Sequence, residues 1–285
     1  MKLPKRFFLP CDEWIYFKIY CGELTLDTLL INELHDYIEE LNTESLINNW
    51  FFIRYYDPDH HIRLRLKVKK SKNSYKIIKT LNTKIEELVV DNFIWKLAIS
   101  SYDRELERYA WLDYNISEIL FHIDSVYFVE SLEYLENNEL KFLYNFKATL
   151  DFIALFYTTD EDRLDFIKAV ETSYKKEFKL TKIAQKQLSL KYRSLKATIA
   201  DFLSDTNNGD FNMLRNALSL KVIEIKELLG TIHFPKTVPE KFSFVFSHIH
   251  MNTNRIFATN QRLYEMITYD HLYRYCNSLT QRNNS

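Results

Sequence analysis

The chain has 285 residues, with 38 Lys and Arg against 39 Asp and Glu, so its formal net charge is −1. It contains only three glycines, although average usage predicts about 20. Gly22, Gly209 and Gly230 lie far apart, which excludes the glycine-rich phosphate loops of P-loop NTPases and Rossmann dehydrogenases. The balanced charge also argues against direct nucleic-acid binding.

Cysteine usage and apolar runs limit the class further. The sequence contains an odd number of cysteines and no CxxC pair, which disfavours a disulfide framework and a structural zinc site. The three are Cys11, Cys21 and Cys276. The apolar run near the N-terminus breaks at Pro10, too early for a signal peptide. No run approaches the roughly 18 apolar residues of a membrane helix. We therefore expect a cytoplasmic protein without metal, cofactor or membrane insertion.

The first hundred residues alternate between strand and helix patterns. Aromatic and β-branched runs predict strands at 14–21, 50–56, 60–68 and 93–101, and apolar residues at helical spacing predict helices at 24–41 and 75–89. The order strand–helix–strand–strand–helix–strand is typical of a ferredoxin-like unit.

The remainder of the chain is predicted to be helical. Helices are expected at 115–137, 140–157, 161–177, 182–204, 211–229, 239–257 and 260–279, with loops at 207–210 and 235–239. The predicted fold class is therefore α+β. A sheet unit at 1–112 precedes a helical half at 113–285, with a cleft between them, and the two together form one integrated domain.

The strand at 60–68 carries the most informative pattern. Successive side chains of a strand point to opposite faces. One face is apolar, and the other presents His61, Arg63, Arg65 and Lys67. In a ferredoxin-like sheet this strand is central, so the cations are expected to face the cleft. Neighbouring strands offer Arg54, Lys18, Tyr16 and Tyr20 to the same region.

Partly buried arginines require anionic partners. Arg63 and Arg65 either pair with carboxylates of this chain or grip the carboxylate of a ligand, for which the planar guanidinium is well suited. A solvated basic face is the simplest alternative.

Two further segments carry polar groups. Residues 102–109 follow the last strand directly, where site residues are common. In the helix at 239–257, His250 and Asn254 share a face at i, i+4. The pairs His60–His61 and His248–His250 both diverge, so neither chelates a metal. A serine nucleophile elbow, G-x-S-x-G, is also missing from the sequence.

These segments together resemble the thiopeptide-type bacteriocin biosynthesis domain, the C-terminal portion of lanthipeptide dehydratases. The resemblance covers about residues 13–280. It rests on WFFIRYYD at 50–57 with HIRLR at 61–65, on YDRELERY at 102–109 with Asp124-Ser125, and on HMNTNR at 250–255. One departure is Ala110-Trp111, where family members usually carry two glycines. A tryptophan there narrows the cleft or redirects the loop.

The resemblance implies β-elimination on a ribosomally made precursor peptide with a leader. A separate protein that depends on glutamyl-tRNA would glutamylate Ser or Thr, and this chain would then expel glutamate to leave dehydroalanine or dehydrobutyrine, without a cofactor. The implied catalytic residues are Arg63, Arg65, Arg108 and His250. Additional substrate-binding candidates are His61, Arg54, Glu105, Asn254 and Arg255. The sequence is also compatible with a homodimer.

Two alternatives remain open. Thiopeptide pyridine synthases have a similar scaffold and join two dehydroalanines in a formal [4+2] cycloaddition. A non-catalytic module would instead bind a leader peptide at the edge of the sheet. The Arg/Arg/Arg/His set favours elimination over the cycloaddition, and removal of His250 would separate elimination from the binding module.

Overall fold

The computed structural model describes residues 4–109, 111–204, 209, 211–232, 234 and 238–283. It combines helices with two antiparallel sheets among these residues, which confirms the mixed class of the fold. The chain divides into two compact units: Met1–Glu133 with His233–Thr259, and Tyr134–Ile232 with Asn260–Ser285. This division differs from the expected boundary at 112/113, because two of the later helices pack with the sheet.

The first unit is built on a four-stranded antiparallel sheet in the order β3-β4-β2-β5. The strands are β2 (Trp14–Cys21), β3 (Ile47–Tyr56), β4 (His60–Val68) and β5 (Ile94–Ser100). β2 and β4 are interior strands, and their side chains are almost all buried. The predicted order of strands and helices is therefore found, and the basic strand is an interior strand as expected.

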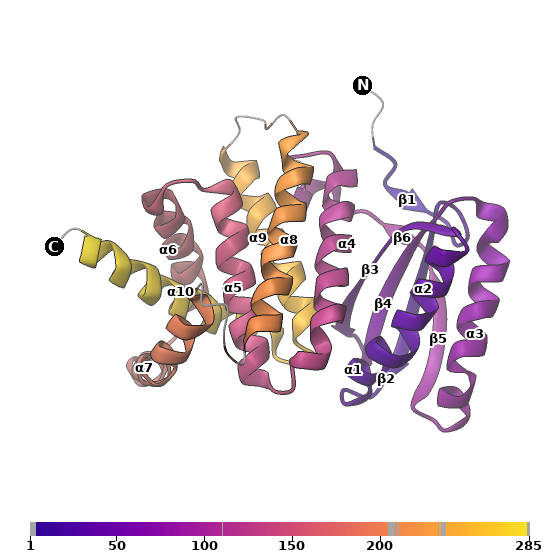
Figure 1. Cartoon of the computed structure of the whole chain (residues 1–285), viewed down its shortest axis with the longest axis horizontal. Coiled ribbons are helices and arrows are strands. Elements are labelled where there is room, and N and C mark those ends of the chain that lie inside the picture. Colours follow the sequence, from indigo (N-terminus) through magenta and orange to yellow (C-terminus); the bar gives the residue numbers. More distant parts are fainter. Residues whose placement is uncertain are drawn as a thin grey trace. The chain divides into compact units, whose positions relative to one another are not determined.

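Helices cover both faces of this sheet (Figure 1). On one side lie α3 (Ser74–Val90) and a helical stretch made of α1 (Thr25–Thr28), the π-helical turn η1 (Leu29–Leu34) and α2 (His35–Thr43). Leu81 and Ile85 of α3 are buried one helical turn apart, as the amphipathic pattern predicts. On the other side are α4 (Tyr114–Ser131) and α9 (Val238–Ile256), both of which contact β3.

Short elements connect the sheet to α4. β1 (Phe7–Phe8) pairs with β6 (Tyr102–Asp103) in a two-stranded sheet, and a 3-10 turn, η3 (Leu106–Tyr109), follows. The Asp113 side chain then accepts a hydrogen bond from the backbone N–H of Asn115 and caps α4.

The second unit is helical. It contains α5 (Asn138–Phe156), α6 (Asp160–Glu177), α7 (Lys182–Leu203), α8 (Asn212–Gly230) and α10 (Gln261–Asn283), and the turn η4 (Leu132–Tyr134) leads into it. α10 packs against α5, α6 and α7, and Tyr269 of α10 stacks on Tyr174 of α6. The predicted helices agree with these bounds to within a few residues. The predicted loops at 207–210 and 235–239 lie largely outside the described residues.

Within the described residues, no helix is both long enough and apolar enough to cross a membrane.

Candidate active site

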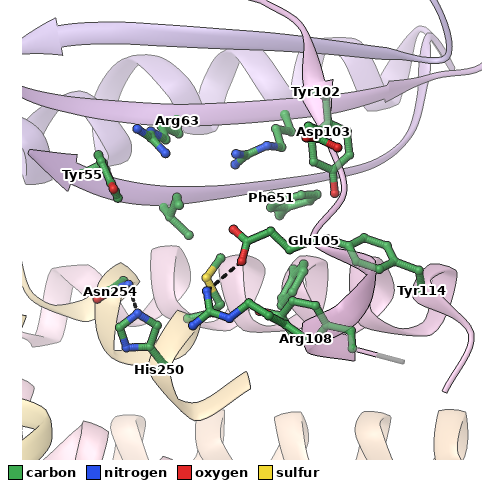
Figure 2. Close-up of a pocket in the computed structure, with 15 residues that line it drawn as sticks. Phe51, Tyr55, Arg63, Tyr102, Asp103, Glu105, Arg108, Tyr114, His250 and Asn254 are labelled. Carbon is green, nitrogen blue, oxygen red and sulfur yellow. Dashed lines mark hydrogen bonds and ion pairs between the residues drawn. The ribbon is translucent and has the colours of Figure 1, made fainter. Parts of the chain in front are cut away.

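A cavity of about 190 Å³ lies inside the first unit, between the sheet on one side and α4, η3 and α9 on the other (Figure 2). It is lined by Phe51, Ile53, Tyr55, Arg63, Arg65, Tyr102, Asp103, Glu105, Arg108, Tyr109, Tyr114, Phe121, His250, Met251 and Asn254. The four residues implied as catalytic, Arg63, Arg65, Arg108 and His250, all line it. The cleft was expected between a sheet half and a helical half, whereas this cavity lies between the sheet and helices of the same compact unit.

The alternation of side chains along β4 directs Arg63 and Arg65 toward the cavity. The apolar side chains of the strand, such as Leu64, are fully buried on the opposite face. Arg65 is paired in register with Tyr16 of β2 and Phe51 of β3. Since β4 is flanked on both sides, its guanidinium groups emerge among the side chains of two neighbouring strands.

Arg65 is surrounded by aromatic rings. Its guanidinium carbon lies 4.3 Å from the ring centroid of Tyr16, 5.1 Å from that of Tyr102 and 5.2 Å from that of Phe51. The residue is only 9% exposed, and neither Nε nor Nη1 has a hydrogen-bond partner in the described part of the chain. A nearly buried cation held only by ring faces favours an anionic ligand strongly.

Arg63 is held by a histidine and a tyrosine. Its Nε donates to Nε2 of His61 at 3.1 Å, and its guanidinium carbon lies 3.4 Å from the ring centroid of Tyr55. Neither Arg63 nor Arg65 forms an ion pair with a carboxylate among the residues that the structure describes. Internal pairing, one of the two options left open by the sequence, is therefore not the arrangement found for these two arginines.

The positive charges of Arg63 and Arg65 affect the pKa values of neighbouring side chains. Burial lowers the pKa of Lys18, and the positive charges of Arg63 and Arg65 lower it further. Burial raises the pKa of Tyr16, while the same two charges act against that shift. The floor of the cavity is therefore electropositive.

Arg108 projects from η3, in the run 102–109 singled out in the sequence. Its Nη1 donates to Oε2 of Glu105 at 2.8 Å, and both side chains are largely exposed. Asp103 lines the same wall. Glu105 lines the cavity and places a carboxylate on Arg108.

His250 and Asn254 of α9 form the opposite wall (Figure 2). The Nδ2 amide group of Asn254 lies 3.1 Å from Nε2 of His250. This contact holds the imidazole of His250 against its own helix at the cavity wall.

Two of the additional candidates lie elsewhere. Arg54 is fully buried, pairs with Asp27 at 2.5 Å and donates from Nε to the backbone carbonyl of Arg255 at 2.6 Å. The guanidinium of Arg255 contacts Asp124 at 3.3 Å and Ser125 at 3.0 Å. Neither arginine lines the cavity. Both connect α9 to α4 and β3, so the structure gives them a packing contact in place of the expected substrate contact.

These contacts also explain two of the sequence motifs. Asp124-Ser125 and Arg255, more than a hundred residues apart, are partners in the same buried cluster. Burial lowers the pKa of Arg255 to about 10, against the pull of the Asp124 carboxylate.

His61 is also absent from the cavity lining, and its Nε2 contacts Nε of Arg63. Its side chain is fully buried, and Nδ1 lies 2.8 Å from the backbone carbonyl oxygen of Asp59. Trp111 is buried and packs against Phe234 and Phe244 instead of narrowing the cavity. Ala110 lies outside the described residues.

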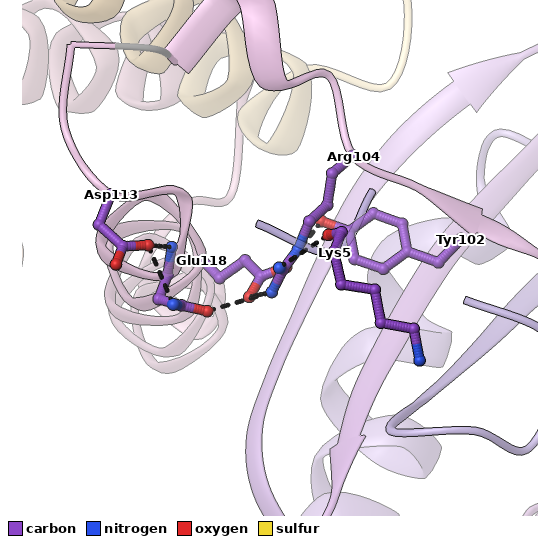
Figure 3. A network of polar contacts seen from close by, with 6 residues as sticks. Lys5, Tyr102, Arg104, Asp113 and Glu118 are labelled. Atoms are coloured by element: carbon purple, nitrogen blue, oxygen red, sulfur yellow. Dashed lines mark hydrogen bonds and ion pairs between the residues drawn. The ribbon is translucent and has the colours of Figure 1, made fainter. Parts of the chain in front are cut away.

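The sequence reasoning missed most of the aromatic lining and a buried polar network beside it (Figure 3). Arg104 forms a bidentate contact with Glu118, at 2.7 Å from Nε and 2.5 Å from Nη2, and Tyr102 donates to the same carboxylate at 3.1 Å. Tyr102 therefore links this network to the aromatic rings that surround the guanidinium of Arg65. Period-two alternation on β3 places Phe51 and Tyr55 on one face, and this pattern was the available signal.

Comparisons with known proteins agree with this architecture. The family model for the lantibiotic biosynthesis dehydratase C-terminal region matches residues 14–276. The nisin biosynthesis protein NisB of Lactococcus lactis subsp. lactis is 29% identical over 276 residues, which are 94% of this chain and 26% of NisB. The chain thus spans about a quarter of the length of that relative.

Two solved structures share the fold. MibB, a tRNA-dependent lantibiotic dehydratase from Microbispora sp. 107891, matches with a TM-score of 0.74 at 15% identity, over 96% of this chain and 29% of MibB. TbtD, a pyridine synthase from thiomuracin biosynthesis, matches with a TM-score of 0.62 at 10% identity, over 93% of this chain and 97% of TbtD. With a family match over nearly its whole length, the chain belongs to the lantibiotic biosynthesis dehydratase C-terminal family.

Proposed function

We propose that this protein is a lyase that eliminates glutamate from glutamylated Ser or Thr residues of a precursor peptide, leaving dehydroalanine or dehydrobutyrine. The observation that carries the proposal is the composition of the cavity. Arg63, Arg65, Arg108 and His250 line one space, and the first two have no carboxylate partner among the described residues. The site needs no cofactor for this chemistry.

Charge complementarity gives the arginines their role. A glutamyl ester carries one free carboxylate, and the ester carboxyl becomes a second when glutamate leaves. Arg65, nearly buried and surrounded by rings, is fixed before substrate arrives, so it stabilises developing negative charge at little reorganisation cost. Arg63 lies two residues away on the same strand face and provides the second cation.

The proton is moved by His250. In the elimination, the Cα–H bond breaks and its proton goes to the imidazole. The electron pair then forms the Cα–Cβ double bond, and the Cβ–O bond breaks to release glutamate. A carboxylate is a weak base and departs without protonation, so the histidine is needed as a base and not as an acid. A neutral imidazole offers one basic ring nitrogen, and His250 lines the cavity.

Arg108 and Glu105 form the exposed side of the site. Their mutual ion pair is half in solvent and is therefore weak. We propose that a substrate carboxylate replaces Glu105 on Arg108, so that three guanidinium groups surround the glutamyl group.

The partners follow from the family. A precursor peptide with its leader is the proposed substrate, and a separate glutamyl-tRNA-dependent protein supplies the glutamyl group in the cytoplasm. This is supported by the match to a quarter of NisB and to part of MibB, a tRNA-dependent dehydratase. We also assign the sheet of the first unit to the ferredoxin-like type, because its strand order places the first and third strands in the interior.

The test is a mass measurement on a glutamylated Ser or Thr peptide with its leader. The wild-type chain should remove the glutamyl group and form the dehydro residue, whereas His250→Gln should leave the peptide unchanged. His35→Gln, at a partly exposed histidine outside the cavity, is the matched control. An unchanged peptide with wild-type protein would refute elimination.

A second candidate is the pyridine-forming cycloaddition, because TbtD matches over nearly its own full length. In that case a peptide with two dehydroalanines would be converted and a glutamylated peptide would not. Binding of the leader that is unaffected by His250→Gln, with no conversion of either peptide, would instead indicate the non-catalytic module.

A further inference from the structure

We propose that His61 is a positioning residue that orients Arg63 in the cavity by accepting a hydrogen bond as a neutral imidazole. The inference rests on the proposed function, since it concerns how the same site binds the glutamyl carboxylate. It replaces the expectation that His61 contacts substrate, because the side chain is fully buried and lies outside the cavity lining.

The two partners of the imidazole fix its tautomer. The backbone carbonyl of Asp59 only accepts, so Nδ1 of His61, at 2.8 Å, carries the proton. Nε2 is then a lone-pair acceptor. Nε–H of Arg63 only donates, and it reaches Nε2 at 3.1 Å. The chain of contacts therefore runs from the Arg63 guanidinium through the ring to the turn between β3 and β4.

This contact uses the Nε of Arg63 and leaves its two terminal amino groups for the cavity. Those groups form the planar fork that binds a carboxylate with two hydrogen bonds. Without the histidine, rotation about the last bonds of the side chain would turn the fork away. A flexible arginine must lose that freedom when substrate binds, at a cost in affinity.

Aromatic contacts hold both members of the pair. The His61 ring stacks on Tyr20 at 4.6 Å between centroids and meets the edge of Tyr55 at 5.7 Å. Tyr55 in turn faces the Arg63 guanidinium at 3.4 Å. The imidazole is thus fixed from β2 and from β3, and it transmits that rigidity to Arg63 on β4.

The charges around the ring keep it neutral. Arg63 of β4 and Lys18 of β2 face it with positive charge, whereas Asp57 in the turn after β3 faces it with negative charge. Tyr20 and Tyr55 contribute phenol groups from β2 and β3, and Asp59 contributes its backbone carbonyl. Burial, opposed in part by the Asp59 hydrogen bond, lowers the pKa of His61, and Arg63 and Lys18 act in the same direction.

Protonation would break the arrangement. A proton on Nε2 would point at Nε–H of Arg63, so the acceptor would become a donor beside another donor, and two positive charges would adjoin. The positioning effect is therefore present at neutral pH and is lost at acid pH, below the usual histidine pKa of about 6.5.

Three variants test the idea in the elimination assay. His61→Phe keeps a ring but removes the acceptor, and it should lower kcat/KM about 10-fold, mainly through KM, because Arg63 must then be immobilised when substrate binds. His61→Gln places an amide oxygen near the position of Nε2, so it should restore most of the activity and remove the acid limb contributed by His61. His60→Phe is the control, because its ring lies on the other face of β4.

A second readout does not depend on activity. Nitrogen NMR of the free wild-type protein, labelled at histidine and arginine, should show His61 protonated at Nδ1 and unprotonated at Nε2. The Nε–H of Arg63 should be protected from exchange in wild type and His61→Gln, but not in His61→Phe. Circular dichroism melting shows whether each variant is folded, and wild type with His61→Gln carries the test if His61→Phe is not.

The outcomes separate the two proposals. A wild-type His61 that is protonated at Nε2 at neutral pH overturns the positioning role, and so does an unprotected Arg63. A folded His61→Phe with wild-type kcat/KM does the same. If the NMR result is as expected but glutamylated peptide is not converted, the positioning of Arg63 stands and the proposed elimination fails.

Discussion

The buried arginines of the first unit differ in whether a carboxylate of the chain pairs with them. Arg104 is buried in a network with Glu118 of α4, and every part of its guanidinium has a protein partner (Figure 3). Arg65, whose guanidinium carbon lies 5.1 Å from the ring centroid of Tyr102, is also nearly buried, but its Nε and Nη1 have no hydrogen-bond partner among the described residues. The chain therefore supplies a carboxylate, Glu118, to the arginine that stabilises the fold, Arg104.

The same contrast extends to the other arginines of the unit. Arg54 has Asp27 and Arg255 has Asp124, and both lie outside the cavity. An unpaired buried charge is destabilising, so folding alone gives no reason for a cation at Arg65, which is consistent with its proposed role in the site. The difference shows that the two cavity arginines of β4, unlike Arg104, Arg54 and Arg255, have no carboxylate partner among the described residues.

The largest expected effect is on the structural side of this comparison. Arg104→Met should lower the free energy of unfolding by about 3–5 kcal/mol, because it leaves Glu118 buried without its cation. Urea denaturation measures this loss. Arg6→Met, which breaks the exposed pair with Glu107, is the control and should change little. Equal losses in the two variants would remove the distinction.

The converse is expected at the cavity. Arg65→Met should lower kcat/KM for elimination about 100-fold, or about 2.7 kcal/mol, through loss of charge stabilisation. The same variant should be as stable as wild type or more stable, since no partner is stranded. Lys67→Met, on the same strand face but outside the cavity lining, is the matched control. A strongly destabilised Arg65→Met would mean that this arginine is structural after all.

A dicarboxylate provides a binding test without catalysis. Glutarate at ten times its dissociation constant should stabilise the wild-type protein by about 1.4 kcal/mol and raise its Tm accordingly. Arg65→Met should show a clearly smaller shift, because the buried cation is missing. Glutaramide, which has the same length but no charge, is the control, and an equal shift with glutaramide would speak against carboxylate binding.

The smallest effect concerns buried histidines. His248 is fully buried beside Ser117 and near Arg255, and burial lowers its pKa well below the usual value. Below about pH 6.5 the unfolded chain therefore binds a proton that the folded chain does not, so stability falls as the pH falls. We expect a loss of about 1 kcal/mol between pH 6.5 and 5.5 from this histidine.

His248→Phe should remove that part of the slope in the unfolding free energy. His61 contributes with the same sign, because its pKa is also lowered. A wild-type stability that rises as the pH falls through this window would contradict the burial of neutral histidines.

Local sequence patterns predicted the elements well. Strand 60–68 coincides with β4, and the helix expected at 182–204 is α7 (Lys182–Leu203). The alternation of β4 also predicted which face carries Arg63 and Arg65, since side-chain direction in a strand depends only on parity. By contrast, the helix expected at 24–41 contains a π-helical turn at Leu29–Leu34, which its apolar spacing did not indicate.

Local sequence patterns could not predict which arginines pair with a carboxylate of the chain. Arg54, Arg63 and Arg65 look alike in the sequence, yet one is paired with Asp27 and the other two face the cavity. Likewise, His61 looked like a ligand contact because it shares the basic face of β4, whereas the structure buries it behind Arg63. Contacts between residues far apart in the chain decide these roles.

The sequence by itself determined the succession of strands and helices, the basic face of β4 and the set of cations and histidines available to a site. Those features depend on period and composition, which are local. Only the tertiary structure decided which arginines received a carboxylate, which were enclosed by rings, and that α9 brings His250 to the sheet. The physical reason is that the cost of a buried charge depends on its three-dimensional neighbours, and these are assembled only when the chain folds.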